Sequence, residues 1–299
     1  MISAQSRQVQ FDRFRYRAEV TPASVRLLSA APLAAALLLA AGCSESADQT
    51  SGGDASAAPQ TVAAELPGPP AGSVAALRAA FGLAENEGQF ERVAGEIVAA
   101  DLSETDITTL EPLVEVPIRR LGLEKTAIDD FGPLADLPLE YLYAADCAVS
   151  DLTPLAGKSI EQLNLMGCPV ESLEPLADCR LGTLWLRRCP VSDIGPLVGT
   201  GLESLDVQDT RVADLTPAAS MTDLRRLNIA GTPVADLSPL RGLRLERIIL
   251  TPSTIGEGWD ALREMPSLQA IDTSFDGEQP QAMAATEFWR RLDAGELND

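Results

Sequence analysis

Two stretches of the chain, residues 160–180 (IEQLNLMGCPVESLEPLADCR) and residues 224–244 (LRRLNIAGTPVADLSPLRGLR), share one pattern of apolar residues. Counting the first residue as offset zero, apolar side chains fall at offsets 0, 3, 5, 10, 13 and 16, and Pro falls at offset 15. Spacings of 21 to 23 residues separate nine starting points of the pattern: Ile97, Ile118, Leu139, Ile160, Leu181, Leu202, Leu224, Leu245 and Leu268. Repetition at a fixed period indicates stacked units that share one core.

Each copy divides into two halves with different periods. Its Leu-x-Leu segment has period two, which predicts a strand with one buried face. Its second half, Val-x-Asp-Leu-x-Pro-Leu, has only about ten residues and a Pro at a fixed position, which is too short for an α-helix with two connections. We therefore expect a parallel sheet on one side and 3₁₀ or extended chain on the other.

The full pattern, LxxLxLxx(C/T)xVxDLxPL, resembles the leucine-rich repeats of the short bacterial, internalin-like class over roughly residues 74–276. This resemblance implies an α/β solenoid with a parallel concave β-sheet, a 3₁₀ or extended convex side, and short helical caps at both ends. Apolar spacing at Val74, Leu77 and Phe81 fits the first cap. The segment AATEFWRRLDAGEL fits the second, although Phe288 and Trp289 in it are alternatively a docking motif.

An apolar run, LLSAAPLAAALLLAAG, occupies residues 27–42 and is followed by Cys43. It follows Arg26, ends in small residues and is short for a membrane span, as in a secretory signal. Residues 39–43 resemble the lipobox of bacterial lipoproteins, with Ala40 where Leu is commoner. That resemblance implies cleavage before Cys43 and lipidation of its thiol. The alternative is a buried apolar helix that ends in Cys.

These signals predict five segments. Residues 1–42 are a signal peptide whose first 25 residues are long and mixed in charge, so we expect the start of translation to lie downstream of Met1. Residues 43–72, rich in Ser, Ala, Gly, Pro and acids, are the lipidated Cys and a disordered tether. Residues 73–96 are the N-terminal helical cap, residues 97–276 the repeats, and residues 277–299 the C-terminal capping helix.

Composition excludes several classes of function. The chain has 299 residues, with 23 Lys plus Arg, 44 Asp plus Glu and no His, for a formal charge of −21. Nucleic-acid binding and polybasic membrane binding both need a basic surface. Without His the commonest general base is missing, and no GxSxG, GxxxxGK[ST] or HExxH motif occurs. We predict a non-enzyme with no cofactor, no metal and no nucleic-acid partner, bound to the membrane through its lipid alone.

Offsets 2, 4 and 6 alternate with the core positions and are expected to face outward on the concave sheet. Two of the three Tyr and one of the three Trp fall there, among several Arg, and these residue types commonly anchor protein interfaces. We predict a monomer that binds a protein or peptide on this face. Its candidate partner-binding residues are Arg120, Tyr141, Tyr143, Gln162, Asn164, Met166, Trp185, Arg187, Arg188, Asp206, Arg226 and Asn228.

Three cysteines, Cys147, Cys168 and Cys189, share offset 8, a position that other copies fill with Thr or Ser. The position therefore favours a small residue, and we expect reduced, buried thiols there. A disulfide or a metal site is the alternative. Cys179 lies near the opposite turn of its repeat and is not expected to reach the row.

A column of aspartates occupies offset 12, before Leu-x-Pro: Asp130, Asp151, Asp193, Asp214 and Asp236. We expect these carboxylates to cap the convex turns through backbone N–H groups. The alternative is a calcium-binding ridge, within a structural surface protein that has no dedicated concave partner. The lipobox resemblance implies the bacterial envelope, and Ser44 favours the outer membrane or cell surface. A host-directed adhesin and a housekeeping scaffold both remain open.

Overall fold

The computed structural model of the chain describes residues 73–273 and 282–297. Cys43, the signal peptide and the tether lie outside these residues. Ten strands form one sheet in the order of the sequence, β1 to β10. The strands are β1 (Gln89–Val93), β2 (Glu96–Asp101), β3 (Arg120–Gly122), β4 (Tyr141–Tyr143), β5 (Ser159–Asn164), β6 (Arg180–Trp185), β7 (Ser204–Asp206), β8 (Arg226–Asn228), β9 (Arg247–Ile249) and β10 (Ala270–Asp272).

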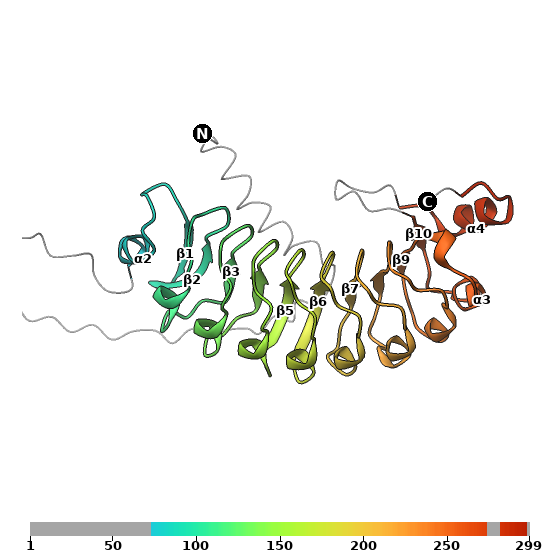
Figure 1. Ribbon diagram of the computed structural model, residues 1–299, viewed down its shortest axis with the longest axis horizontal. Coiled ribbons are helices and arrows are strands. Elements are labelled where there is room, and N and C mark those ends of the chain that lie inside the picture. Colours follow the sequence, from blue (N-terminus) through green and yellow to red (C-terminus); the bar gives the residue numbers. More distant parts are fainter. Residues whose placement is uncertain (1–72, 274–281, 298–299) are drawn as a thin grey trace, which may run out of the picture. The chain divides into compact units, whose positions relative to one another are not determined.

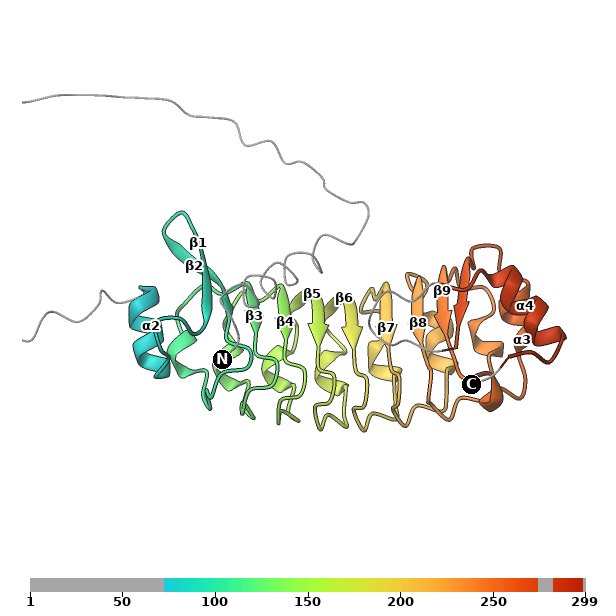
Figure 2. The ribbon, with the colours of Figure 1, turned by 90° about the horizontal axis from the view of Figure 1, so that it is seen from above.

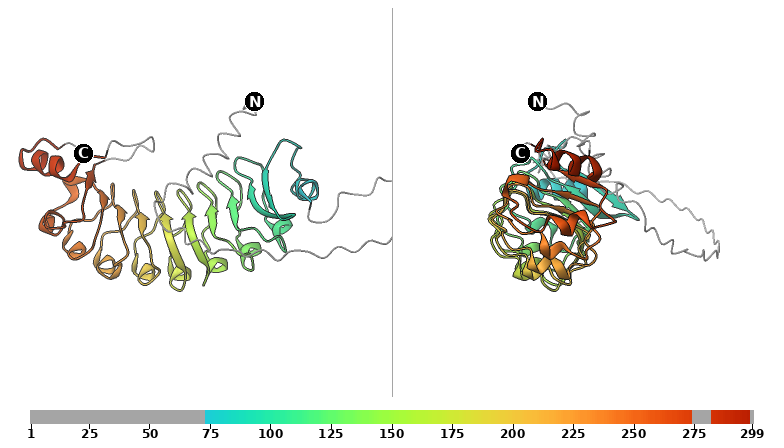
Figure 3. Two further views of the ribbon diagram at one scale, coloured as in Figure 1. Left: turned by 180° about the vertical axis from the view of Figure 1, so that it is seen from behind. Right: turned by 90° about the vertical axis from the view of Figure 1, so that its right-hand side faces the viewer.

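The predicted repeat is the structural unit of the sheet. From β2 to β10 the neighbouring strands are parallel, and residues one repeat apart are aligned, as in Leu142↔Leu163 and Leu163↔Leu184. Offset 3 and offset 5 side chains enter one continuous core. Figure 1 shows the strands along the inner side of the arc of repeats and the turns along the outer side, and the coils superimpose in the end view of Figure 3. The α/β leucine-rich repeat solenoid is confirmed.

Short 3₁₀ turns form most of the convex side: η1 (Glu111–Leu113), η2 (Gly132–Leu134), η3 (Thr153–Leu155), η4 (Glu174–Leu176), η5 (Gly195–Leu197), η6 (Thr216–Ser220), η7 (Ser238–Leu240) and η8 (Pro252–Thr254). In η1 to η7 the second residue is Pro, which has no N–H to leave unsatisfied. In five of these turns the N–H of the first residue is donated to the offset 12 aspartate, at 2.7 Å for Gly195 N to Asp193 Oδ1. In η1 and η4 the hydroxyls of Thr109 and Ser172 accept it, at 3.2 and 3.3 Å. The remaining four aspartates accept in the same way at 2.6 to 2.8 Å, which confirms the capping prediction.

The N-terminal cap differs in part from the prediction. Helix α2 (Val74–Phe81) is capped at its N-terminus by Ser73, whose Oγ accepts the N–H of Ala76 at 3.1 Å. The rest of the expected cap is not helical: β1 pairs antiparallel with β2, and Figure 2 shows this hairpin projecting beside α2. Gly88 and Gly95 adopt φ values of 61° and 95°, which favour turns at both ends of β1 over a continuing helix.

The C-terminal cap contains two helices, α3 (Trp259–Arg263) and α4 (Ala285–Asp293). Helix α3 takes the place of a 3₁₀ turn in the last repeat, where the repeat pattern decays. Phe288 of α4 is fully buried, and its ring lies 6.0 Å from that of Trp259 and 5.2 Å from that of Trp289. This burial favours the capping interpretation of Phe288 over a docking motif. None of the helices in the described residues has the length and hydropathy of a membrane span.

Candidate functional site

The concave face is formed by offsets 2, 4 and 6 of strands β2 to β10. It carries four Arg and four acidic residues over the described residues: Arg120, Arg187, Arg226, Arg247, Asp101, Glu124, Asp206 and Asp272. The whole chain, in contrast, has 44 acidic residues against 23 basic ones. The concave face is therefore close to neutral within an acidic protein, and a partner approaching it meets less negative charge than elsewhere.

Offset 4 side chains are more buried than the strand alternation predicts. Asn164, Asp206 and Asn228 are exposed by only 1%, 8% and 5%. Each Oδ1 accepts the backbone N–H two residues later, at 3.1, 2.9 and 3.1 Å. These side chains curl back onto the turn that follows the strand, in the manner of an Asx turn. A structural role therefore explains part of this column, which we expected to be fully outward-facing.

In the N-terminal half of the face, charged and aromatic side chains contact one another. The Arg120 guanidinium lies 5.1 Å from the centre of the Tyr141 ring and 3.7 Å from Glu91 of β1. Burial is the main factor that raises the pKa of the half-buried Tyr141 hydroxyl, so this group stays protonated. Tyr143 is buried, contrary to the expectation, and its hydroxyl donates to Gln162 Oε1 at 2.6 Å.

In the C-terminal half of the face, Gln208 links three other side chains. Its Oε1 accepts from Arg187 Nη2 at 2.5 Å and from Asn228 Nδ2 at 3.1 Å, and its Nε2 donates to Asp209 at 3.1 Å. Burial raises the pKa of the nearby Asp206 carboxyl. Gln208 was not among the predicted binding residues, although its place at offset 6 would have allowed its selection.

Trp185 is half-buried and lies two residues before Arg187 in the same repeat. The sheet register aligns Trp185 with Asp206, and Asp206 with Asn228. The structure thus brings Trp185, Arg187, Asp206 and Asn228 together over three adjacent strands, β6 to β8. Met166, on the preceding repeat, is also half-buried.

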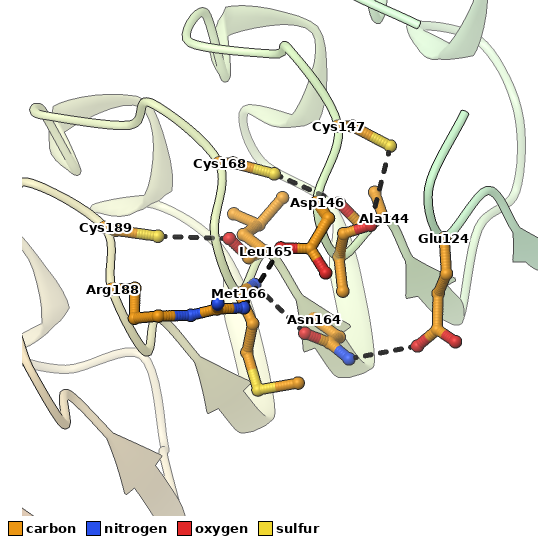
Figure 4. Close-up of polar contacts among 11 residues, drawn as sticks. Glu124, Ala144, Asp146, Cys147, Asn164, Leu165, Met166, Cys168, Arg188 and Cys189 are labelled. Carbon is orange, nitrogen blue, oxygen red and sulfur yellow. Dashed lines mark hydrogen bonds and ion pairs between the residues drawn. The ribbon is translucent and has the colours of Figure 1, made fainter. Parts of the chain in front are cut away.

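Arg188, at offset 7, directly follows the concave residue Arg187. It is exposed in the loop after β6, where it has a φ of 62°, and its Nη2 lies 3.0 Å from Asp146 Oδ1 (Figure 4). The pair spans the repeat between them, where a Cβ at Gly167 would collide with the Asp146 carboxylate. Offset 7 takes a left-handed backbone conformation, which ends the strand alternation at this position. Lys125 and Glu104, at the same offset, form a similar pair at 2.8 Å.

The four described cysteines are free thiols. Cys168 and Cys189 donate to the carbonyl oxygens of Ala144 and Leu165 on the preceding repeats, both at 3.0 Å (Figure 4). Burial raises the pKa of Cys168 to about 12 and that of Cys189 to about 11. Protonated thiols that donate hydrogen bonds are poor nucleophiles and poor metal ligands, which agrees with the expected reduced row.

Cys179 is separate from this row, as expected, and its thiol donates to the Leu155 carbonyl at 3.2 Å. Within residues 73–273 and 282–297, no three Cys, Asp or Glu side chains are grouped as metal ligands would be. The convex aspartates instead act as caps. Arg247 is a further concave residue that the prediction missed, and it forms an ion pair with Asp272 at 2.7 Å.

Comparisons with solved structures agree with this fold. Internalin C2 from Listeria monocytogenes superimposes with a TM-score of 0.54 and 23% sequence identity, covering 66% of this chain and 89% of that one. A second Listeria monocytogenes internalin gives a TM-score of 0.47 at 19% identity, covering 65% and 72%. A leucine-rich repeat protein of Leptospira interrogans gives 0.43 at 13%, covering 66% and 59%. The first of these supports the leucine-rich repeat fold.

The sequence itself has no match among protein-family models or curated proteins.

Proposed function

We propose that this chain is a non-catalytic, protein-binding lipoprotein of the bacterial envelope, which recognises a protein or peptide through its concave face. The observation that carries this proposal is the cluster on β6 to β8. There a half-buried Trp185 lies two residues before Arg187, which belongs to a hydrogen-bonded polar network with Gln208 and Asn228. Trp and Arg side chains held in place by neighbours are the usual energetic centres of protein interfaces.

The concave face also has a suitable size and charge. Strands lie about 4.8 Å apart, so the eight spacings from β2 to β10 extend over roughly 38 Å. This length accommodates a standard protein interface. The near-neutral face within an acidic chain directs association to this surface, because like charges elsewhere repel an acidic protein.

Affinity capture from envelope extracts and extracellular fluid tests the proposal. Three forms of the chain are compared: the parent, a concave variant (Tyr141→Ala, Trp185→Ala, Arg187→Gln) and a control variant (Val114→Ala, Val198→Ala, Arg211→Gln). The control removes the same number of charges and two exposed apolar side chains outside the concave face; Val114 and Val198 are 46% and 41% exposed. Circular dichroism checks that all three forms are folded.

A protein that the parent and the control retain, and that the concave variant loses, supports the proposal. Equal retention by all three forms contradicts it and moves the contact to another surface. If no protein is retained, the structural alternative without a dedicated partner is favoured.

The anchor is a separate part of the proposal. We propose that cleavage occurs before Cys43, that lipid on Cys43 holds the chain at the outer membrane or cell surface, and that residues 43–72 act as a tether to a monomeric repeat domain. The composition of residues 27–43 supports this. Metabolic labelling with a radioactive fatty acid is expected to mark the parent and not a Cys43→Ala variant. Equal labelling of both forms would contradict it.

A further inference from the structure

Trp185 and Arg226 are two half-buried residues of the concave face, and their side chains favour different kinds of ligand group. Trp185 presents an indole ring, whose flat apolar surface suits an apolar or aromatic side chain. Arg226, on β8, has no carboxylate within ion-pair distance among residues 73–273 and 282–297, whereas the neighbouring Arg247 is paired with Asp272 at 2.7 Å. A partly desolvated guanidinium with no counter-charge favours an incoming carboxylate.

Local charge favours the same class of ligand. Offsets 2, 4 and 6 of β6 to β8 carry Arg187 and Arg226 against a single acid, Asp206. The corresponding positions of β2 and β3 carry Asp101 and Glu124 against Arg120 alone, and Arg120 also lies 3.7 Å from Glu91 of β1. The C-terminal half of the face is therefore its positive half, within a chain whose formal charge is −21.

The sheet register defines the separation of the two side chains. Trp185 is aligned with Asn228 two strands away, because Trp185 pairs with Asp206 and Asp206 with Asn228. Arg226 precedes Asn228 by two residues on β8. Two strand spacings are about 10 Å and two residues along a strand about 6.6 Å, so the Cα atoms of Trp185 and Arg226 lie roughly 12 Å apart.

The distance between Trp185 and Arg226 predicts how many residues separate the two contacting side chains in the partner. An extended chain advances about 3.3 Å per residue, so roughly 12 Å corresponds to three or four residues. Side chains of an extended chain alternate between two faces, so only an even spacing turns both toward the sheet. Four residues satisfies both conditions.

We propose that the partner presents an extended acidic segment to the concave face, with an apolar side chain on Trp185 and a carboxylate on Arg226 four residues away. This inference rests on the proposed function and specifies the chemistry of its partner. The segment crosses β6, β7 and β8 obliquely. The hydrogen-bonded side chains of Asp206, Gln208 and Asn228 form the floor between the two contacts.

A bead-displayed peptide series tests the inference with the full chain. Each peptide contains one Phe and one Asp, separated by one to seven positions in a Gly-Ser background, and a parallel series has Lys in place of Asp. Display at high density compensates for the weak affinity of single short peptides. Retention of the parent chain is expected to peak at a spacing of four in the Asp series and to be absent in the Lys series.

Three variants identify the contacts. Trp185→Ala and Arg226→Gln are each expected to lower retention at the peak by about tenfold or more. Arg211→Gln removes one exposed charge outside the concave face and is expected to leave retention unchanged. Raising the salt concentration from about 50 to 500 mM is expected to weaken retention of the parent more than that of Arg226→Gln.

Several outcomes would overturn the inference: a profile without a peak at four, a peak that survives Arg226→Gln, or equal retention in the Lys series. Absent retention, together with a dimer in analytical ultracentrifugation that Trp185→Ala dissociates, would assign the site to a second copy of the chain. If an envelope protein is captured through the concave face while the peptide profile is flat, the proposed function stands and this inference alone fails.

Discussion

At the residue scale, the solenoid depends on small polar groups at fixed offsets. Offset 8 shows this clearly. Thr126, Thr210 and Thr232 donate their hydroxyls to the carbonyl three residues earlier, at 2.8, 2.6 and 2.6 Å. The thiols of Cys168 and Cys189 instead donate to the preceding repeat. Either residue therefore satisfies a carbonyl at offset 5, which explains why both are accepted at one position.

The thiols are expected to be unreactive in the folded chain. With a pKa of about 12, Cys168 has a thiolate fraction at pH 8 of roughly one in ten thousand, against roughly one in four for an ordinary thiol. In a Cys43→Ser background, a thiol-specific disulfide reagent should label all four remaining cysteines in denaturant and react far more slowly without it. Rapid labelling of Cys168 or Cys189 in the folded chain would show that the row is accessible.

The convex caps predict how stability depends on pH. Hydrogen bonds from Thr153 and Thr216 hold the pKa of Asp151 and Asp214 below the ordinary value. Since the unfolded chain then binds more protons, the caps stabilise the fold above about pH 4 and lose this contribution as pH falls through the lower folded-state pKa. An Asp151→Asn, Asp214→Asn variant keeps the acceptor oxygens, so its Tm should fall less than that of the parent between roughly pH 5 and pH 3.

The control for this measurement is Asp178→Asn with Asp223→Asn, two exposed aspartates outside the capping column. These changes remove the same charge without removing a cap. Identical acid dependence in the two double variants would contradict the assigned role of the caps.

At the scale of elements, each strand has only three to six residues, and no strand is stable alone. Stability comes from stacking against two neighbours, so the terminal repeats need caps. Helix α2 closes one end together with the β1–β2 hairpin, and helix α4 closes the other with a cluster of three aromatic rings.

Loss of a buried side chain from the C-terminal cap should therefore lower the free energy of unfolding. Phe288→Ala removes a fully buried aromatic side chain, and we expect a loss of about 3–5 kcal/mol in the free energy of unfolding. Hydrogen exchange should show the loss first in β9 and β10, because each repeat contacts only its neighbours. Phe288→Leu keeps apolar volume and should cost much less. A Phe288→Ala chain as stable as the parent would favour a docking role for this residue.

At the scale of the whole molecule, the excess of acidic residues opposes compaction. The formal charge of −21 produces repulsion that salt screens, whereas the exposed ion pairs that salt also weakens contribute little individually. We expect the Tm at pH 7 to rise when NaCl increases from about 10 to 200 mM.

A variant with Glu171→Gln, Asp178→Asn and Asp223→Asn reduces the excess of negative charge by replacing three exposed acidic side chains. Its Tm should be higher at low salt and less dependent on NaCl. A Tm that falls with added salt would show that ion pairs outweigh the repulsion.

The sequence by itself determined the repeat, the core and the convex caps. Each of these depends on contacts one repeat apart, such as Leu142 with Leu163, or on contacts within one turn, such as Asp193 with Gly195. A fixed period therefore encodes them directly.

Only the tertiary structure decided which concave side chains are accessible. The burial of Tyr143 and Asn164, the Arg188–Asp146 pair and the Gln208 network depend on left-handed loop residues and on side-chain contacts between different repeats. The period of two along a strand does not predict these contacts. It predicts on which face of the sheet a side chain lies, but not which other side chains surround it on that face. The strand β1 was missed for the related reason that its pairing with β2 lies outside the repeat.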